Sequence, residues 1–76
     1  MAARRDLGAT VAKKVREVIV VLERNGWVLV RQRGSHRQFR HPHVPFVVTV
    51  AGKPNATVPP GILGSIRRTS GLEELR

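Results

Sequence analysis

Residues 27–40 read WVLVRQRGSHRQFR and decide the fold, because this stretch places two strand-like runs on either side of a turn. The first run, residues 27–32, is rich in residues that favour strands. Gly34 and Ser35 supply the turn, and the strand that follows alternates in direction, with His36, Gln38 and Arg40 on one face and Arg37, Phe39 and His41 on the other. The alternation predicts that Phe39 faces the core and that His36 faces away from it.

A helix is predicted directly before this hairpin. Apolar residues recur there at the spacing of one buried helix face, namely Val11, Val15, Val18, Ile19 and Leu22. Thr10 is the candidate N-cap, and Asn25-Gly26 ends the helix, because glycine adopts the left-handed conformation at little steric cost.

A third strand and a second helix are predicted after the hairpin. Residues 42–45 contain two prolines and form a turn, residues 46–50 form the strand, and residues 51–58 form a loop. Pro59-Pro60-Gly61 leads into a helix that buries Leu63 and Ile66 and ends at Gly71. Residues 73–76 are expected to be a short tail.

These elements predict an α+β domain with the order α-β-β-β-α. Short connections make the three strands an antiparallel sheet, and both helices cover one face of it in a two-layer architecture. The 76 residues suffice for one domain, which we assign to residues 10–76. Residues 1–9 show no periodicity and are interpreted as a flexible basic arm.

The charge balance indicates a polyanionic partner. Lys and Arg number 14 against 5 Asp and Glu, for a formal net charge of +9, and residues 24–72 contain no acidic residue. Most of the cations are Arg, whose planar guanidinium suits phosphate, so nucleic acid is favoured. The absence of cysteine excludes disulfides and thiolate metal sites, and no signal or membrane segment is evident, so a cytoplasmic location is expected.

Three motifs together resemble the HicA toxins of bacterial toxin–antitoxin pairs, from about residue 16 to the end. They are Asn25-Gly26-Trp27 after a helix, Gly34-Ser35-His36 with Phe39 three residues later, and Pro60-Gly61 followed by Gly71-Leu72. The resemblance implies a fold like a double-stranded-RNA-binding domain and a ribonuclease that a HicB-type antitoxin blocks. It also implies that cleavage depends on His36.

The residues themselves are consistent with that chemistry. RNA carries its own nucleophile, the 2′-hydroxyl, so cleavage needs a proton acceptor, a proton donor and cations near the phosphate. Imidazole exchanges protons near neutral pH, which suits His36. The candidate RNA-binding residues are Arg31, Arg33, Ser35, Arg37, Arg40 and Lys53. We expect no metal and no other cofactor, because the carboxylates lie near the chain ends and the histidine spacing does not suit a metal site.

Other residues near the motif are given plainer interpretations. His41 is interpreted as a structural residue at a strand end, His43 as an exposed loop residue, and Trp27 as part of the core rather than a platform for stacking bases. HicA toxins commonly carry a second histidine, in a Pro-x-His segment after the third strand. Residues 51–54 occupy that place here and contain no histidine, although Lys53 lies among them.

The sequence therefore predicts a toxin endoribonuclease that cleaves mRNA without metal and is neutralised by an acidic HicB-type antitoxin. A non-catalytic RNA-binding module is the main alternative, because the charge and the fold class require nothing of His36. A weaker third possibility is an interaction protein whose basic face only docks an acidic partner.

Overall fold

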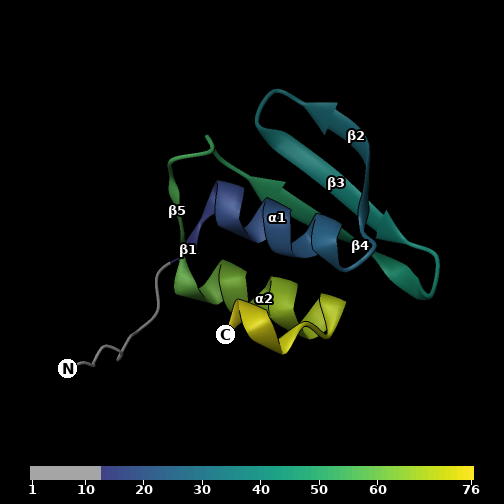
Figure 1. Cartoon of the computed structure of the whole chain (residues 1–76). Coiled ribbons are helices and arrows are strands. Elements are labelled where there is room, and N and C mark those ends of the chain that lie inside the picture. The colour runs from purple at the N-terminus through teal and green to yellow at the C-terminus, as the bar shows by residue number, and fades with distance from the viewer. Residues whose placement is uncertain (1–12) are drawn as a thin grey trace.

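The structure is a computed structural model that describes residues 13–76. Its elements are β1 (Lys13–Lys14), α1 (Val15–Arg24), β2 (Val28–Arg33), β3 (His36–His41), β4 (Val44–Ala51), β5 (Thr57–Val58), α2 (Pro60–Ser70) and the short 3-10 helix η2 (Glu73–Leu75) (Figure 1). The main sheet is antiparallel with the order β2-β3-β4. The predicted α+β class and α-β-β-β-α order are confirmed, and they are consistent with a fold like a double-stranded-RNA-binding domain.

The first helix begins later than the sequence predicted. Lys14 has an extended backbone, with φ −82° and ψ 153°, and Lys13 and Lys14 pair with β5 in a small second sheet. The prediction of helix at these two residues is therefore wrong, because strand pairing with the segment before α2 overrides helix propensity. Glu17 accepts a hydrogen bond of 2.7 Å from the Lys14 backbone N–H and caps α1. Thr10, Val11 and the proposed arm lie outside the described residues.

The predicted ends of both helices are confirmed. Gly26 and Gly71 follow α1 and α2 with φ values of 90° and 74°, in the left-handed region that glycine tolerates. Pro60 is the first residue of α2, as predicted. The expected short tail is wrong, because residues 73–75 form η2 and the Leu75 side chain is fully buried. The expected loop at 51–58 likewise includes the two residues of β5.

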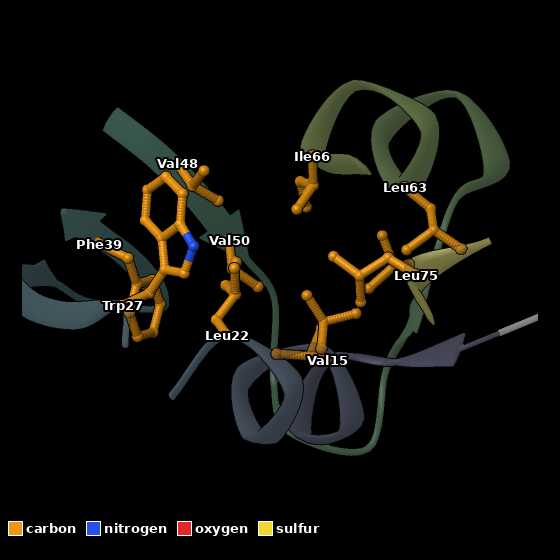
Figure 2. Close-up of a cluster of buried hydrophobic side chains, with 11 residues drawn as sticks. Val15, Leu22, Trp27, Phe39, Val48, Val50, Leu63, Ile66 and Leu75 are labelled. Atoms are coloured by element: carbon orange, nitrogen blue, oxygen red, sulfur yellow. The ribbon is translucent and has the colours of Figure 1, made fainter. Parts of the chain in front are cut away.

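The hydrophobic core lies between the helices and one face of the main sheet (Figure 2). Its buried members are Val15, Val18, Leu22, Trp27, Phe39, Val48, Val50, Val58, Leu63, Ile66 and Leu75. Phe39 and Trp27 lie at one end of this cluster, and Trp27 is only 2% exposed, which confirms that it belongs to the core. All six residues of β2 are exposed, so the helices cover β3 and β4 but not this edge strand.

Candidate functional site

His36 is the first residue of β3 and directly follows the turn that joins β2 to β3. Gly34 has φ 59° and Ser35 has a negative φ, which is the pattern of a type II′ turn with glycine at its first central position. Arg33 pairs with His36 across this two-residue turn. On its other side His36 pairs with Ala51, the last residue of β4. His36 is thus held in the middle strand at the end of the sheet.

The strand register gathers a group of polar side chains around His36. One cross-strand row contains Arg33, His36 and Ala51, and the other contains Arg31, Gln38 and Thr49. Both rows lie on the face of the sheet opposite Phe39 and the core, because side chains alternate along each strand. Directly opposite residues in such rows have Cβ atoms about 5 Å apart. Arg33 is therefore the direct neighbour of the imidazole across the strands, and Arg31 and Gln38 lie one row farther along the same face.

These side chains line a shallow hollow of about 260 Å³. Its lining residues are Arg31, Arg33, His36 and Gln38. We call these four residues the His36 hollow. His36 is exposed within it, as the alternation around Phe39 predicted, and Arg31 and Arg33 were also named from the sequence. Gln38 was not, although the same alternation placed it on the face of His36. Its amide both donates and accepts hydrogen bonds, so it can contact a ribose or a base.

The remaining candidate RNA-binding residues occupy different places. Arg40 is exposed on the same face as His36 but pairs with Val28 farther along the sheet. Lys53 is exposed in the loop that follows Ala51. Ser35 is half-buried, and its carbonyl oxygen accepts a hydrogen bond of 3.2 Å from the Gly52 N–H. The structure brings Arg31 and Arg33 to the His36 hollow and leaves these three around its margin.

Arg37 differs from the other candidates, because it lies on the opposite face of the sheet and is half-buried. It pairs with Gln32 and Val50, and Val50 belongs to the core. Its Nη1 donates hydrogen bonds to the Ser35 carbonyl oxygen at 3.2 Å and to the Gly52 carbonyl oxygen at 2.9 Å. One nitrogen of the guanidinium is therefore occupied by backbone acceptors beside His36.

The other two histidines lie at the far end of β3. His41 lies five positions after His36 along the extended strand, which corresponds to roughly 16 Å at about 3.3 Å per residue. The His41 Nδ1 accepts a hydrogen bond of 3.0 Å from the His43 backbone N–H, so its Nε2 is the atom that donates to the Asn25 carbonyl oxygen at 3.1 Å. The His41 ring also packs against Trp27, with centroids 5.3 Å apart. These contacts support the structural interpretation of His41.

Residues 13–76 contain no group of three or more histidine, cysteine or acidic side chains placed to hold a metal ion. In the same part of the chain, no helix combines the length and the apolar character that crossing a bilayer requires.

The side chains of the described site are an imidazole, guanidinium groups and one amide. Such a set can bind a phosphodiester and move protons at it.

Comparison with known families bears directly on this site. The family model described as the HicA toxin of bacterial toxin–antitoxin systems matches residues 15–72. The chain belongs to the HicA toxin family. The matched range spans α1, the whole main sheet and α2, and so includes every residue of the His36 hollow. A search of curated proteins gave no match. As a HicA toxin, the protein is the toxin component of a toxin–antitoxin pair, which implies an antitoxin as its partner.

Proposed function

We propose that this HicA toxin is an endoribonuclease that cleaves mRNA without a metal ion and uses His36 as its catalytic residue. The observation that carries the proposal is the His36 hollow, where one exposed imidazole lies beside Arg31 and Arg33 on the open face of the sheet. The acid-free stretch of residues 24–72 contains this whole face, so a polyanion meets no repelling carboxylate there. Bacterial mRNA is cytoplasmic, and we place the action of the toxin there.

The proposed reaction requires no nucleophile from the protein. The 2′-oxygen of a ribose attacks the adjacent phosphorus while the His36 imidazole takes the hydroxyl proton. Arg31 and Arg33 stabilise the added negative charge on the phosphate oxygens, because guanidinium groups donate to two oxygens at once. The P–O5′ bond breaks, and the leaving oxygen takes a proton from the imidazolium or from water. The products are a 2′,3′-cyclic phosphate and a 5′-hydroxyl.

The proposed antitoxin is an acidic, HicB-type protein that covers the His36 hollow. Carboxylates on such a partner would meet the exposed guanidinium groups of β2, a strand that neither helix covers. Electrostatic complementarity of this kind speeds association and selects the partner. It also excludes RNA from the same surface, which accounts for neutralisation without any change in the fold of the toxin.

Cleavage in the presence of EDTA tests the proposed function. Purified toxin is expected to cut single-stranded RNA with EDTA present, and mass spectrometry is expected to find cyclic phosphate ends. His36→Ala should abolish the cleavage, whereas His43→Ala is the matched control, because His43 is exposed in the turn between β3 and β4. Cleavage that EDTA abolishes, or that His36→Ala retains, would contradict the proposal.

One observation favours a non-catalytic RNA-binding module as the second candidate. Within residues 13–76, neither of the other histidines shares the His36 hollow, so a second imidazole for the leaving group is missing there. A binding module would hold RNA in a salt-dependent manner and leave it intact. Retention of full-length RNA by wild-type toxin under the cleavage conditions would select this candidate.

A further inference from the structure

We propose that Arg37 is a positioning residue that fixes the backbone of His36 from the opposite face of the sheet, rather than a contact to RNA. The inference rests on the proposed function for its effect on cleavage. The set of hydrogen bonds itself is observed in the structure. We call the Arg37 guanidinium together with the Ser35 and Gly52 carbonyl groups the clamp.

The clamp lies next to the cross-strand pair formed by His36 and Ala51. Ser35 directly precedes His36, and Gly52 directly follows Ala51, the partner of His36 on β4. Arg37 Nη1 donates to the Ser35 oxygen at 3.2 Å and to the Gly52 oxygen at 2.9 Å, which uses both hydrogens of that nitrogen. The Gly52 N–H donates to the same Ser35 oxygen at 3.2 Å. Two of these hydrogen bonds, Arg37 to Gly52 and Gly52 to Ser35, therefore join the β3 and β4 segments immediately beyond the His36–Ala51 pair, and the third holds Arg37 to the turn before His36.

This end of the sheet needs such a restraint. His36 and Ala51 are terminal residues of their strands, and ladder ends open more readily than ladder centres. Gly34, with φ 59°, lies two residues before His36, and Gly52, with φ 116°, directly follows Ala51. Glycine leaves the backbone more freedom than any other residue. The clamp fixes both glycine-containing segments relative to each other.

The clamp is also attached to the core. A Cβ atom at Gly52 would lie 3.3 Å from Cγ2 of Val15, a buried residue at the start of α1. The Val15 N–H donates to the Ala56 carbonyl oxygen at 2.9 Å, which fixes the loop after Gly52. Arg37 thus ties the turn before His36 to a segment that α1 already holds.

The position of Arg37 argues against a direct phosphate contact. Adjacent residues of a strand point to opposite faces, so a phosphate bound over His36 lies across the sheet from the Arg37 side chain. Moving the guanidinium to that phosphate would break both backbone hydrogen bonds of Nη1. Its expected contribution is therefore to the geometry of His36, where a displacement of about 1 Å can reduce a rate about a hundredfold.

Kinetics of three variants separate positioning from RNA binding. Arg37→Met keeps the length of the stem but has no donor, and we expect kcat to fall about tenfold to a hundredfold while KM changes less than about twofold. Arg37→Lys restores a donor and should recover part of kcat. Arg40→Met is the comparator on the open face, and it should raise KM instead.

Amide hydrogen exchange tests the clamp without RNA. The Gly52 amide should exchange at least about tenfold faster in Arg37→Met than in wild type, with Arg37→Lys between them and Arg40→Met unchanged. Unchanged Gly52 exchange would overturn the clamp. A raised KM with unchanged kcat in Arg37→Met would also overturn the proposal and assign Arg37 to phosphate binding. Failure of wild-type toxin to cut RNA would instead contradict the proposed function and leave the exchange result as the test of the clamp.

Discussion

Asn25 and Glu74 lie far apart in the sequence, yet the Asn25 side-chain amide donates a 2.9 Å hydrogen bond to Glu74 Oε2. The same amide nitrogen donates to the Val21 carbonyl oxygen at 2.8 Å, and Arg24 forms an ion pair with Glu74. These contacts attach η2 to the end of α1, and η2 also contains the buried Leu75 side chain. The C-terminal residues therefore belong to the folded unit that supports the sheet.

The first prediction concerns Glu74 and acid. The hydrogen bond from Asn25, followed by that from Arg24, lowers the pKa of Glu74 below its ordinary value of 4.5. A carboxylate with a lowered folded-state pKa stabilises the fold above pH 4.5, and this contribution is lost as pH falls through the folded-state value. Glu74→Gln should therefore lower Tm modestly at pH 7, and the difference from wild type should shrink below pH 4.5.

Thermal unfolding followed by circular dichroism between pH 3 and pH 7 checks this prediction. Glu23→Gln removes the same charge at an exposed position of α1 and serves as the control. A Tm difference for Glu74→Gln that stays constant over the whole range would show that the Glu74 contacts contribute nothing through charge.

A second prediction follows from the hydrogen bonds of His41. Its ring joins the Asn25 carbonyl at the end of α1 to the backbone N–H of His43 in the hairpin turn, and it packs on Trp27. His41→Ala leaves the partly buried Asn25 carbonyl oxygen without its partner and removes the ring that packs on Trp27, so we expect a loss of about 1–3 kcal/mol in the free energy of unfolding. Urea denaturation measures it. His43→Ala should change stability by less than about 0.5 kcal/mol, and equal losses in both variants would refute the structural role of His41.

Local patterns predicted the main sheet and both helices because those elements carry their signals within a few residues. The alternation around Phe39 and the glycines at 26 and 71 are signals of this kind. The small sheet and η2 carry none. Two-residue strands have no periodicity, and the burial of Leu75 depends on α1, which lies about fifty residues earlier in the sequence. Long-range contacts alone specify these elements.

The candidate site could likewise be predicted only in part from local patterns. Arg31, Arg33 and His36 could be placed on one face from strand alternation, and the same reasoning would have added Gln38. The hydrogen bonds of Arg37 could not be foreseen, because they require the carbonyl of Gly52 to approach the turn before His36. That approach is set by the register of β3 on β4, which the sequence pattern leaves open.

The third prediction concerns Gly34 and the shape of the turn. A Cβ atom at Gly34 would meet no other atom within 4 Å, so Gly34→Ala tests backbone strain alone at φ 59°. We expect a loss of about 1–2 kcal/mol in the free energy of unfolding, and slower RNA cleavage because the turn holds His36. Gly61→Ala is the matched control, since Gly61 also has open space but lies within α2 at negative φ. Gly61→Ala should be neutral or stabilising. Equal stability of the two variants, measured by urea denaturation, would contradict the turn geometry.

The last prediction concerns the salt dependence of RNA binding at the His36 hollow. Arg33 is exposed and pairs directly with His36, so its guanidinium is placed to meet a phosphate bound over the imidazole. Arg33→Gln in a His36→Ala background, which prevents cleavage, should reduce the slope of log affinity against log salt by about 0.7 for single-stranded RNA, the value of one lost phosphate contact. Fluorescence anisotropy at several salt concentrations measures this slope. Arg68→Gln removes the same charge from an exposed position on α2, on the helical side of the molecule, and should leave the slope unchanged. The two arginines carry the same charge but lie on opposite sides of the domain, so only a localised contact with RNA distinguishes them. If both variants reduce the slope equally, RNA is held by the net charge of the protein and not by the open face of the sheet.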